Sequence, residues 1–164
     1  MGLQLPGELV SILSMLGYDW PTSDEEKLFQ LGQLWVEFAP RMEAAGAAAL
    51  ASGSAYWDNN RGEAAQAFQT WWNGSDSPAN ALQQGIPGAS LVGAGLMVCA
   101  GVVLALKIQV IVQLAILVVQ IAQAIATAVA TFGASLLEIP IFKMITSLIL
   151  DQLIGMAIEA VLNG

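Results

Sequence analysis

The sequence predicts an all-α protein, specifically an elongated antiparallel helical bundle with long apolar helices in its C-terminal half. Apolar side chains recur at intervals of three and four residues along most of the chain, and no stretch shows the period of two that marks a strand. The stretch from Ser77 to Leu137 holds one charged side chain, Lys107. Apolar surface left in water costs about 25 cal/mol per Å², so this stretch needs extensive cover.

Acidic charge is concentrated in the N-terminal half of the chain. The 164 residues include 13 Asp or Glu against 5 Lys or Arg, a net charge of −8. Ten of the acids precede residue 86. We therefore expect one structural unit made of two parts, an acidic hairpin at residues 1–85 and an apolar helical extension at residues 86–164 that packs on it. No basic patch is present, so we expect no nucleic-acid partner.

The composition argues against an enzyme. The chain has no histidine and a single cysteine, Cys99, which excludes His-based acid–base chemistry, His-ligated metals and an internal disulfide. The acids Asp24, Glu25 and Glu26 fit a cluster in the first turn of a helix better than a catalytic pair. We expect no catalytic residue, no cofactor and no metal.

Two helices are predicted in the first third of the chain. The first spans Leu5–Gly17, with Pro6 in its first turn and a glycine at its end. The second begins at a capping-box pattern formed by Ser23 and Glu26 and extends to about Ser54. Its large apolar residues alternate in spacing between three and four, which is typical of a seam that packs on another helix. The predicted seam consists of Leu28, Leu31, Trp35, Phe38 and Met42.

Proline and glycine predict where the helices bend or end. Pro40 predicts a kink, because it lacks an N–H and crowds the carbonyl four residues earlier. A turn is expected at residues 52–62, where Asn60 caps the next helix. Further breaks are expected at residues 74–78, 85–88, 133 and 140, leaving long apolar helices at residues 89–131 and 141–162.

Two polar features interrupt the apolar half. We expect Lys107 at the surface, with its stem on apolar neighbours and its ammonium in water. A narrow line of Gln and Thr fits a weakly polar solvent face or a seam between helices, and its alternative role is the water-facing side of a membrane pore. The line consists of residues 109, 113, 120, 123, 127 and 131.

A segment near the middle of the chain consists of Trp57 followed by Gly62-Glu63-Ala64-Ala65-Gln66-Ala67-Phe68-Gln69-Thr70-Trp71, and a literal Trp-x-Gly follows as Trp72-Asn73-Gly74. This segment resembles the centre of WXG100 proteins, which are small helical hairpins exported by type VII secretion systems. The resemblance implies a partner-binding and secretion motif. An ordinary hairpin core also explains the aromatic residues, and both roles can coexist. The motif comprises Trp57, Gly62, Phe68, Trp71, Trp72 and Gly74.

The N-terminal segments Leu5–Leu9, Gly17–Pro21 and Asp24–Leu28 resemble a narrower group, the WXG100-like N-terminal domains of actinobacterial toxins similar to the mycobacterial channel protein with necrosis-inducing toxin. The resemblance implies a secretion-targeting domain at the start of a larger protein. It implies small WXG100-like helical partners, or self-association, and the secretion machinery. It also implies a cytoplasmic protein that is secreted or placed at the cell surface without a cleavable signal peptide.

The apolar half leaves one alternative open, a membrane-inserting or pore-forming domain at residues 89–137 that delivers a fused toxin. A spanning helix needs about 20 apolar residues. Ala89–Leu106 lies at the lower limit and Val110–Phe132 is long enough. Flanking aromatic belts and clustered Lys or Arg, which usually mark spanning helices, are absent from the sequence.

Overall fold

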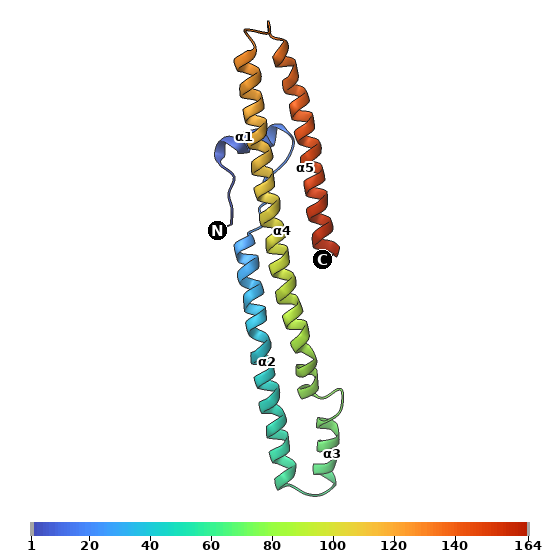
Figure 1. Ribbon diagram of the computed structural model, residues 1–164. Coiled ribbons are helices and arrows are strands. Elements are labelled where there is room, and N and C mark those ends of the chain that lie inside the picture. Colours follow the sequence, from blue (N-terminus) through green and yellow to red (C-terminus); the bar gives the residue numbers. More distant parts are fainter. Residues whose placement is uncertain (1, 164) are drawn as a thin grey trace. The chain divides into compact units, whose positions relative to one another are not determined.

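The computed structural model describes residues 2–163, and most of them are helical (Figure 1). No strand occurs among these residues, so the predicted all-α class is confirmed. The elements in chain order are α1 (Gly7–Met15), α2 (Glu25–Asn59), α3 (Glu63–Trp72), α4 (Pro78–Thr127), the 3-10 helix η1 (Ala134–Leu137) and α5 (Glu138–Asn163).

The contacts divide the chain into two compact units. One, here called the hairpin unit, is Phe29–Met97. The other, here called the terminal unit, combines the residues up to Leu28 with those from Val98 onward. Residue 85, the expected end of the acidic part, lies inside α4, and the assignment of residues 1–85 and 86–164 to separate roles stays a prediction.

In the hairpin unit, α2 and α4 pack through small residues. Buried positions of α2 recur every seven residues at Gly32, Ala39 and Gly46. A Cβ built on Gly32 would lie 2.8 Å from the carbonyl oxygen of Gly93, and one built on Gly93 would lie 2.8 Å from the carbonyl oxygen of Gly32. The two backbones therefore touch, and the contact depends on the absence of side chains.

The predicted seam of α2 does not make this contact. Leu31, Trp35 and Phe38 are exposed, and Leu28 and Met42 are half-buried. The large residues do share one face of the helix, as their spacing predicts, but the close approach to α4 uses a face of small residues. Packing of the predicted seam on another helix stays a prediction.

The turn between α2 and α3 is shorter than predicted. Because α2 runs to Asn59, the expected turn at residues 52–62 shrinks to Asn60–Gly62. Asn60 does not cap α3: its side-chain amide donates to the carbonyl oxygen of Tyr56 at 2.7 Å, and Gly62 holds the N-cap position. The side chain of Asn60 thus binds the end of the helix that precedes it.

Prolines interrupt the helices less than the sequence predicts. Pro40 lies inside α2, Pro87 lies inside α4, and Pro140 lies in the first turn of α5. A first-turn proline costs little because its missing N–H has no partner within the helix. Helix α4 continues through residues 85–88 and α5 continues through residue 140, so the breaks expected there are wrong. Gly133, with a φ of 84°, does separate two helices.

Two helix starts are fixed by side-chain caps. At α2 the cap is Asp24, one residue later than the predicted Ser23, because its Oδ1 accepts the backbone N–H of Lys27 at 3.1 Å. At α4 the buried hydroxyl of Ser77 accepts the backbone N–H of Asn80 at 3.2 Å, and Pro78 takes the first helical position.

In the terminal unit, α4 and α5 lie side by side and antiparallel, with α1 against them (Figure 1). The predicted glycine at the end of α1 is confirmed, since Gly17 follows the helix with a φ of 86°. Tyr18 then donates its hydroxyl to Asp151 Oδ1 at 2.7 Å, with the carbonyl oxygen of Ser147 at 3.0 Å. The buried core consists of Leu5, Leu13, Val110, Leu114 and Leu150.

Lys107 is buried, so its predicted place at the surface is wrong. Only 1% of the residue is exposed, and its Nζ donates to Glu25 Oε2 at 2.7 Å and to the carbonyl oxygen of Ser23 at 2.6 Å. The second oxygen of Glu25 accepts the backbone N–H of Leu3. Burial raises the pKa of the Glu25 carboxyl, but the hydrogen bonds from Lys107 and Leu3 outweigh burial and lower this pKa to about 2.

Helices α4 and α5 present apolar surface that the chain does not bury. In the most apolar 18-residue segment of α4, 22% of the residues are buried, and in that of residues 134–163, 11% are buried. Both helical stretches have the length and composition of a membrane span, a test that core helices of soluble proteins also pass. This surface is therefore available to a further partner or solvent.

Candidate partner-binding surface

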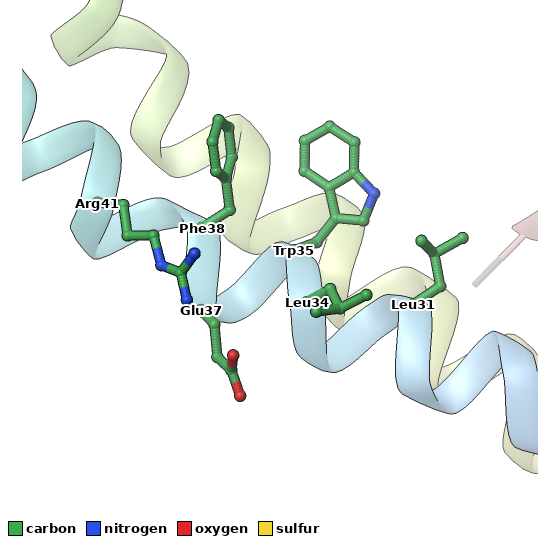
Figure 2. Close-up of a pocket in the computed structure, with 6 residues that line it drawn as sticks. All are labelled: Leu31, Leu34, Trp35, Glu37, Phe38 and Arg41. Carbon is green, nitrogen blue, oxygen red and sulfur yellow. The ribbon is translucent and has the colours of Figure 1, made fainter.

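An exposed apolar row runs along α2 in the hairpin unit. Its members follow the spacing i, i+3, i+4 and i+7, so they share one helix face. The rings of Trp35 and Phe38 meet edge to face with centroids 6.0 Å apart, and Figure 2 shows them projecting side by side from α2. The row lines an open groove of about 390 Å³. We call it the α2 row; it consists of Leu31, Leu34, Trp35 and Phe38, and Glu37 and Arg41 complete the groove lining.

The α2 row offers substantial area for burial. Leu34 is 61% exposed, Trp35 37% and Phe38 46%. An aromatic side chain carries about 150–250 Å² of surface, so covering the exposed part of each ring would contribute about 2 kcal/mol. Surface of this kind is typical of the anchors at a protein interface.

A second group of aromatic side chains gathers around Phe68 of α3. The ring centroid of Phe68 lies 5.1 Å from that of Tyr56, 5.5 Å from Trp72, 5.9 Å from Trp71 and 6.1 Å from Trp57. We call these five residues the α3 cluster. The structure thus brings together the four aromatic residues of the sequence-predicted motif and adds Tyr56.

Helix α2 makes room for the α3 cluster at Gly53. A Cβ at this position would lie 2.5 Å from Nε1 of Trp72 and 2.8 Å from the Trp57 ring. The same glycine lines a groove of about 410 Å³ together with Ser52, Tyr56, Phe68 and Trp72. Trp57, Phe68 and Trp72 are half-buried, whereas Tyr56 is 45% exposed and Trp71 is 53% exposed. The cluster is therefore a local core with a phenol and an indole at its surface.

The two glycines of the predicted motif shape turns at the ends of α3. Gly62 has a φ of 115°, a conformation that favours glycine. Gly74 follows the helix; its N–H donates to the carbonyl oxygen of Trp71 at 3.0 Å, and its own carbonyl accepts the side-chain amide of Asn80 at 2.8 Å. Both glycines act here on the backbone, and their part in secretion stays a prediction.

Two members of these surfaces were missed by the sequence reading. Leu34 lies three residues after Leu31 and one before Trp35, so a helical period of 3.6 would have added it to the row, whereas the seam pattern of 3.5 passed over it. The sequence predicts a turn at Tyr56, because the pattern indicates an end of α2 that is too early. With the helix extended to Asn59, Tyr56 falls three residues after Gly53, on the face that meets α3.

The chemistry available at these surfaces is apolar contact. Among residues 2–163, no group of three His, Cys, Asp or Glu side chains is placed to hold a metal ion. The side chains that meet at the α2 row and the α3 cluster are indole, phenyl, phenol and isobutyl groups, with one acid and one guanidinium at the groove. These surfaces therefore offer apolar contact area.

Comparison with known proteins places this architecture in a family. No curated protein and no solved structure matches the chain significantly. A family model described as "WXG100 like domain" matches residues 4–148, from the start of the terminal unit through both surfaces and into α5. Proteins of the WXG100 family are non-enzymatic and helical, associate with partner proteins and secretion machinery, and are typically secreted by type VII systems. The chain belongs to the WXG100-like domain family and is a helical protein related to type VII secretion.

Proposed function

We propose that the chain is the secretion-targeting and partner-binding domain of a type VII secretion effector or toxin of the actinobacterial kind. It binds a small WXG100-like helical protein, or a second copy of itself, in the cytoplasm. The complex then leaves through the secretion machinery and reaches the cell surface or the medium. The observation that carries this proposal is the exposed α2 row.

The geometry of the α2 row favours a helical partner. Anchors at i, i+3, i+4 and i+7 on a straight helix face fit the groove or ridge of another helix. Trp35 and Phe38 supply the large rigid contacts that dominate binding energy. Glu37 and Arg41 carry opposite charges beside them, which can orient a partner without adding much affinity.

The α3 cluster supports a second contact. Its interior, centred on Phe68, holds α2 and α3 together, while the exposed indole of Trp71 is free to meet another protein. We therefore expect Trp71→Asp to weaken association and export with the hairpin intact. Phe68→Asp should abolish both, because a charge at the centre of the cluster also unfolds it.

Copurification from the native host tests the proposal. The tagged chain should elute in a stoichiometric complex with a small helical protein or as a dimer. Replacing Trp35 and Phe38 together by alanine removes about 4 kcal/mol of burial, which should weaken the complex at least a hundredfold. The matched control is Leu91→Ala, which shortens an apolar side chain of α4 that is 75% exposed. Association of the double variant at wild-type strength would refute the role of the α2 row.

Membrane insertion by residues 89–137 is a second candidate function. It is favoured by the small share of buried residues in the most apolar segment of α4, 22%, and by the absence of charge between Lys107 and Glu138. If these residues form a pore, the purified chain should release dye from liposomes. A charge introduced by Val118→Asp, at a partly exposed position, should reduce the release. An inert chain across lipid compositions would exclude this candidate.

A further inference from the structure

The connection between α4 and α5 has the composition of a protein interior but lies at the surface. We call residues 128–137 the tip. Phe132 is 99% exposed, Val129 is 90% exposed and Leu137 is 75% exposed. No charged residue occurs between Lys107 and Glu138. Turns in contact with water are normally built from polar residues and glycine, so this tip is an exception that needs a reason.

Several backbone groups of the tip form hydrogen bonds within the chain. The N–H of Gly133 donates to the carbonyl oxygen of Ala128 at 2.8 Å, and that of Ala134 donates to the carbonyl oxygen of Thr131 at 3.0 Å.

Its two hydroxyl groups also bond inward. The hydroxyl of Thr131 lies 3.0 Å from the carbonyl oxygen of Thr127, and that of Ser135, which is buried, lies 2.7 Å from the carbonyl oxygen of Ala124. In water, a hydroxyl or backbone group without an internal partner can bond to the solvent. In hydrocarbon, each polar group without a partner costs several kcal/mol.

The conformation of Phe132 adds a third observation. Its φ of 51° lies in the left-handed region, and the bond from Gly133 to Ala128 is the one that closes a helix at such a residue. Glycine or asparagine is favoured there, and a bulky residue is strained. Phe132 gains no contact inside the chain in return, because almost all of its surface is exposed. In a turn that contacts only water, glycine or asparagine would be favoured over phenylalanine at this position.

From these observations we propose that the tip inserts into the outer hydrocarbon layer of a lipid bilayer, with Phe132 foremost. Val129 and Leu137 enter beside it, while Glu138 and Lys143 remain at the level of the headgroups. Insertion leaves the α4–α5 hairpin folded and uses neither the α2 row nor the α3 cluster, so it stands apart from partner binding. It also differs from spanning by residues 89–137, because only the turn leaves the water.

The charge of the chain selects the kind of bilayer. The net charge is −8, and Lys143 is the nearest basic residue in the sequence to the tip. An anionic surface repels such a protein over about one Debye length. The tip should therefore bind zwitterionic phosphatidylcholine vesicles better than vesicles rich in phosphatidylglycerol, the reverse of what basic membrane-binding proteins show.

Flotation of the full chain with phosphatidylcholine vesicles tests the inference. The wild type should float, and Phe132→Gly should lower its partition coefficient at least tenfold, the value expected for losing one buried phenyl group. This variant relieves the left-handed strain and removes no contact, so it should melt at or above the wild-type temperature. Leu91→Ala, which shortens an apolar side chain outside the tip that is 75% exposed, should float as the wild type does.

The controls separate this inference from both proposed functions. Phe132→Gly should retain the copurifying partner, and Val118→Asp should retain flotation even if it abolishes dye release. Flotation of the wild type with phosphatidylcholine that Phe132→Gly does not reduce would overturn the inference, as would a wild type that stays with the aqueous fraction. Loss of the copurifying partner in Phe132→Gly would also overturn it, because the tip would then be a protein-binding surface.

Discussion

Replacing Lys107 by methionine keeps most of the apolar stem and removes the ammonium group. In the native structure this group binds the carboxylate of Glu25 and the carbonyl oxygen of Ser23. The variant leaves a buried charge without its partner, which typically costs about 3–5 kcal/mol. For a chain of this length the melting temperature should fall by about 10 °C.

The pKa of Glu25 gives the same interaction a pH signature. It is lowered from 4.5 to about 2, so the folded chain keeps this carboxyl ionised at pH values where the unfolded chain protonates it. The resulting stabilisation is fully present above pH 4.5 and is lost as the pH falls toward 2. Its size is at most about 3 kcal/mol. Without Lys107 the pKa of Glu25 rises, so the variant should lose less stability across this range.

Thermal unfolding followed by circular dichroism, at pH 7 and at steps down to pH 2, measures both effects. Lys143→Met is the matched control, since it removes the charge of a half-buried lysine of α5 and should change stability by less than about 1 kcal/mol. Adding Glu25→Leu to Lys107→Met should restore most of the loss, because an apolar pair replaces the lone charge. If Lys107→Met melts within about 2 °C of the wild type and keeps its acid dependence, the buried pair does not stabilise the fold.

Three further outcomes follow from local packing. Gly93→Ala should destabilise the chain by about 1–3 kcal/mol in urea, because its methyl group meets the α2 backbone; Gly95→Ala, which meets nothing within 4 Å, should stabilise it by about 0.5–1 kcal/mol. Tyr18→Phe should cost about 1 kcal/mol. It should also remove the late step of an ultraviolet titration, since the hydrogen bond to Asp151 raises the pKa of that phenol. Gly53→Ala should displace an indole of the α3 cluster and shift the tryptophan fluorescence.

The helical class, the end of α1 and the break at Gly133 could be predicted because each depends on local sequence. Periodicity identifies a helix wherever one face meets apolar surface, and glycine marks the left-handed residue that ends it. Most of the aromatic cluster could also be predicted, because Phe68, Trp71 and Trp72 lie on adjacent turns of one helix. Trp57 joins them because the turn that follows it is short.

The path through the prolines could not be predicted from local rules. A proline inside a helix costs about 3 kcal/mol, and the sequence offers no direct sign that packing will offset that cost. Helix α4 runs through Pro87 because small residues on both sides, Ala79, Ala89 and Gly93 among them, are buried in the hairpin unit. Tertiary contacts therefore override the local preference.

The burial of Lys107 was missed for a different reason. Its partner, Glu25, lies 82 residues earlier in the chain, and the acid sits in a cluster that fits a helix start equally well. The exposure of the α2 row could not be predicted either. Periodicity shows which residues share a helix face, but it does not show whether that face is covered by this chain or by another one. The small residues at Gly32, Ala39 and Gly46 gave the better signal for the intramolecular contact.

The seven-residue repeat of small residues has a consequence for registry. Suppose that α2 shifted along α4 by one heptad, about 10 Å. Ala39 would then face Gly93, and small residues of α2 would again pack on small residues of α4, so the shift would cost little packing energy. In coiled coils whose apolar contacts allow several alignments, a single buried polar pair can select one of them, because the pair forms only in that alignment. Glu25 and Lys107 form a pair of this kind. A slip of one heptad would bury both charges apart from each other, so Lys107, the one charged residue between Ser77 and Leu137, sets the alignment of α2 on α4.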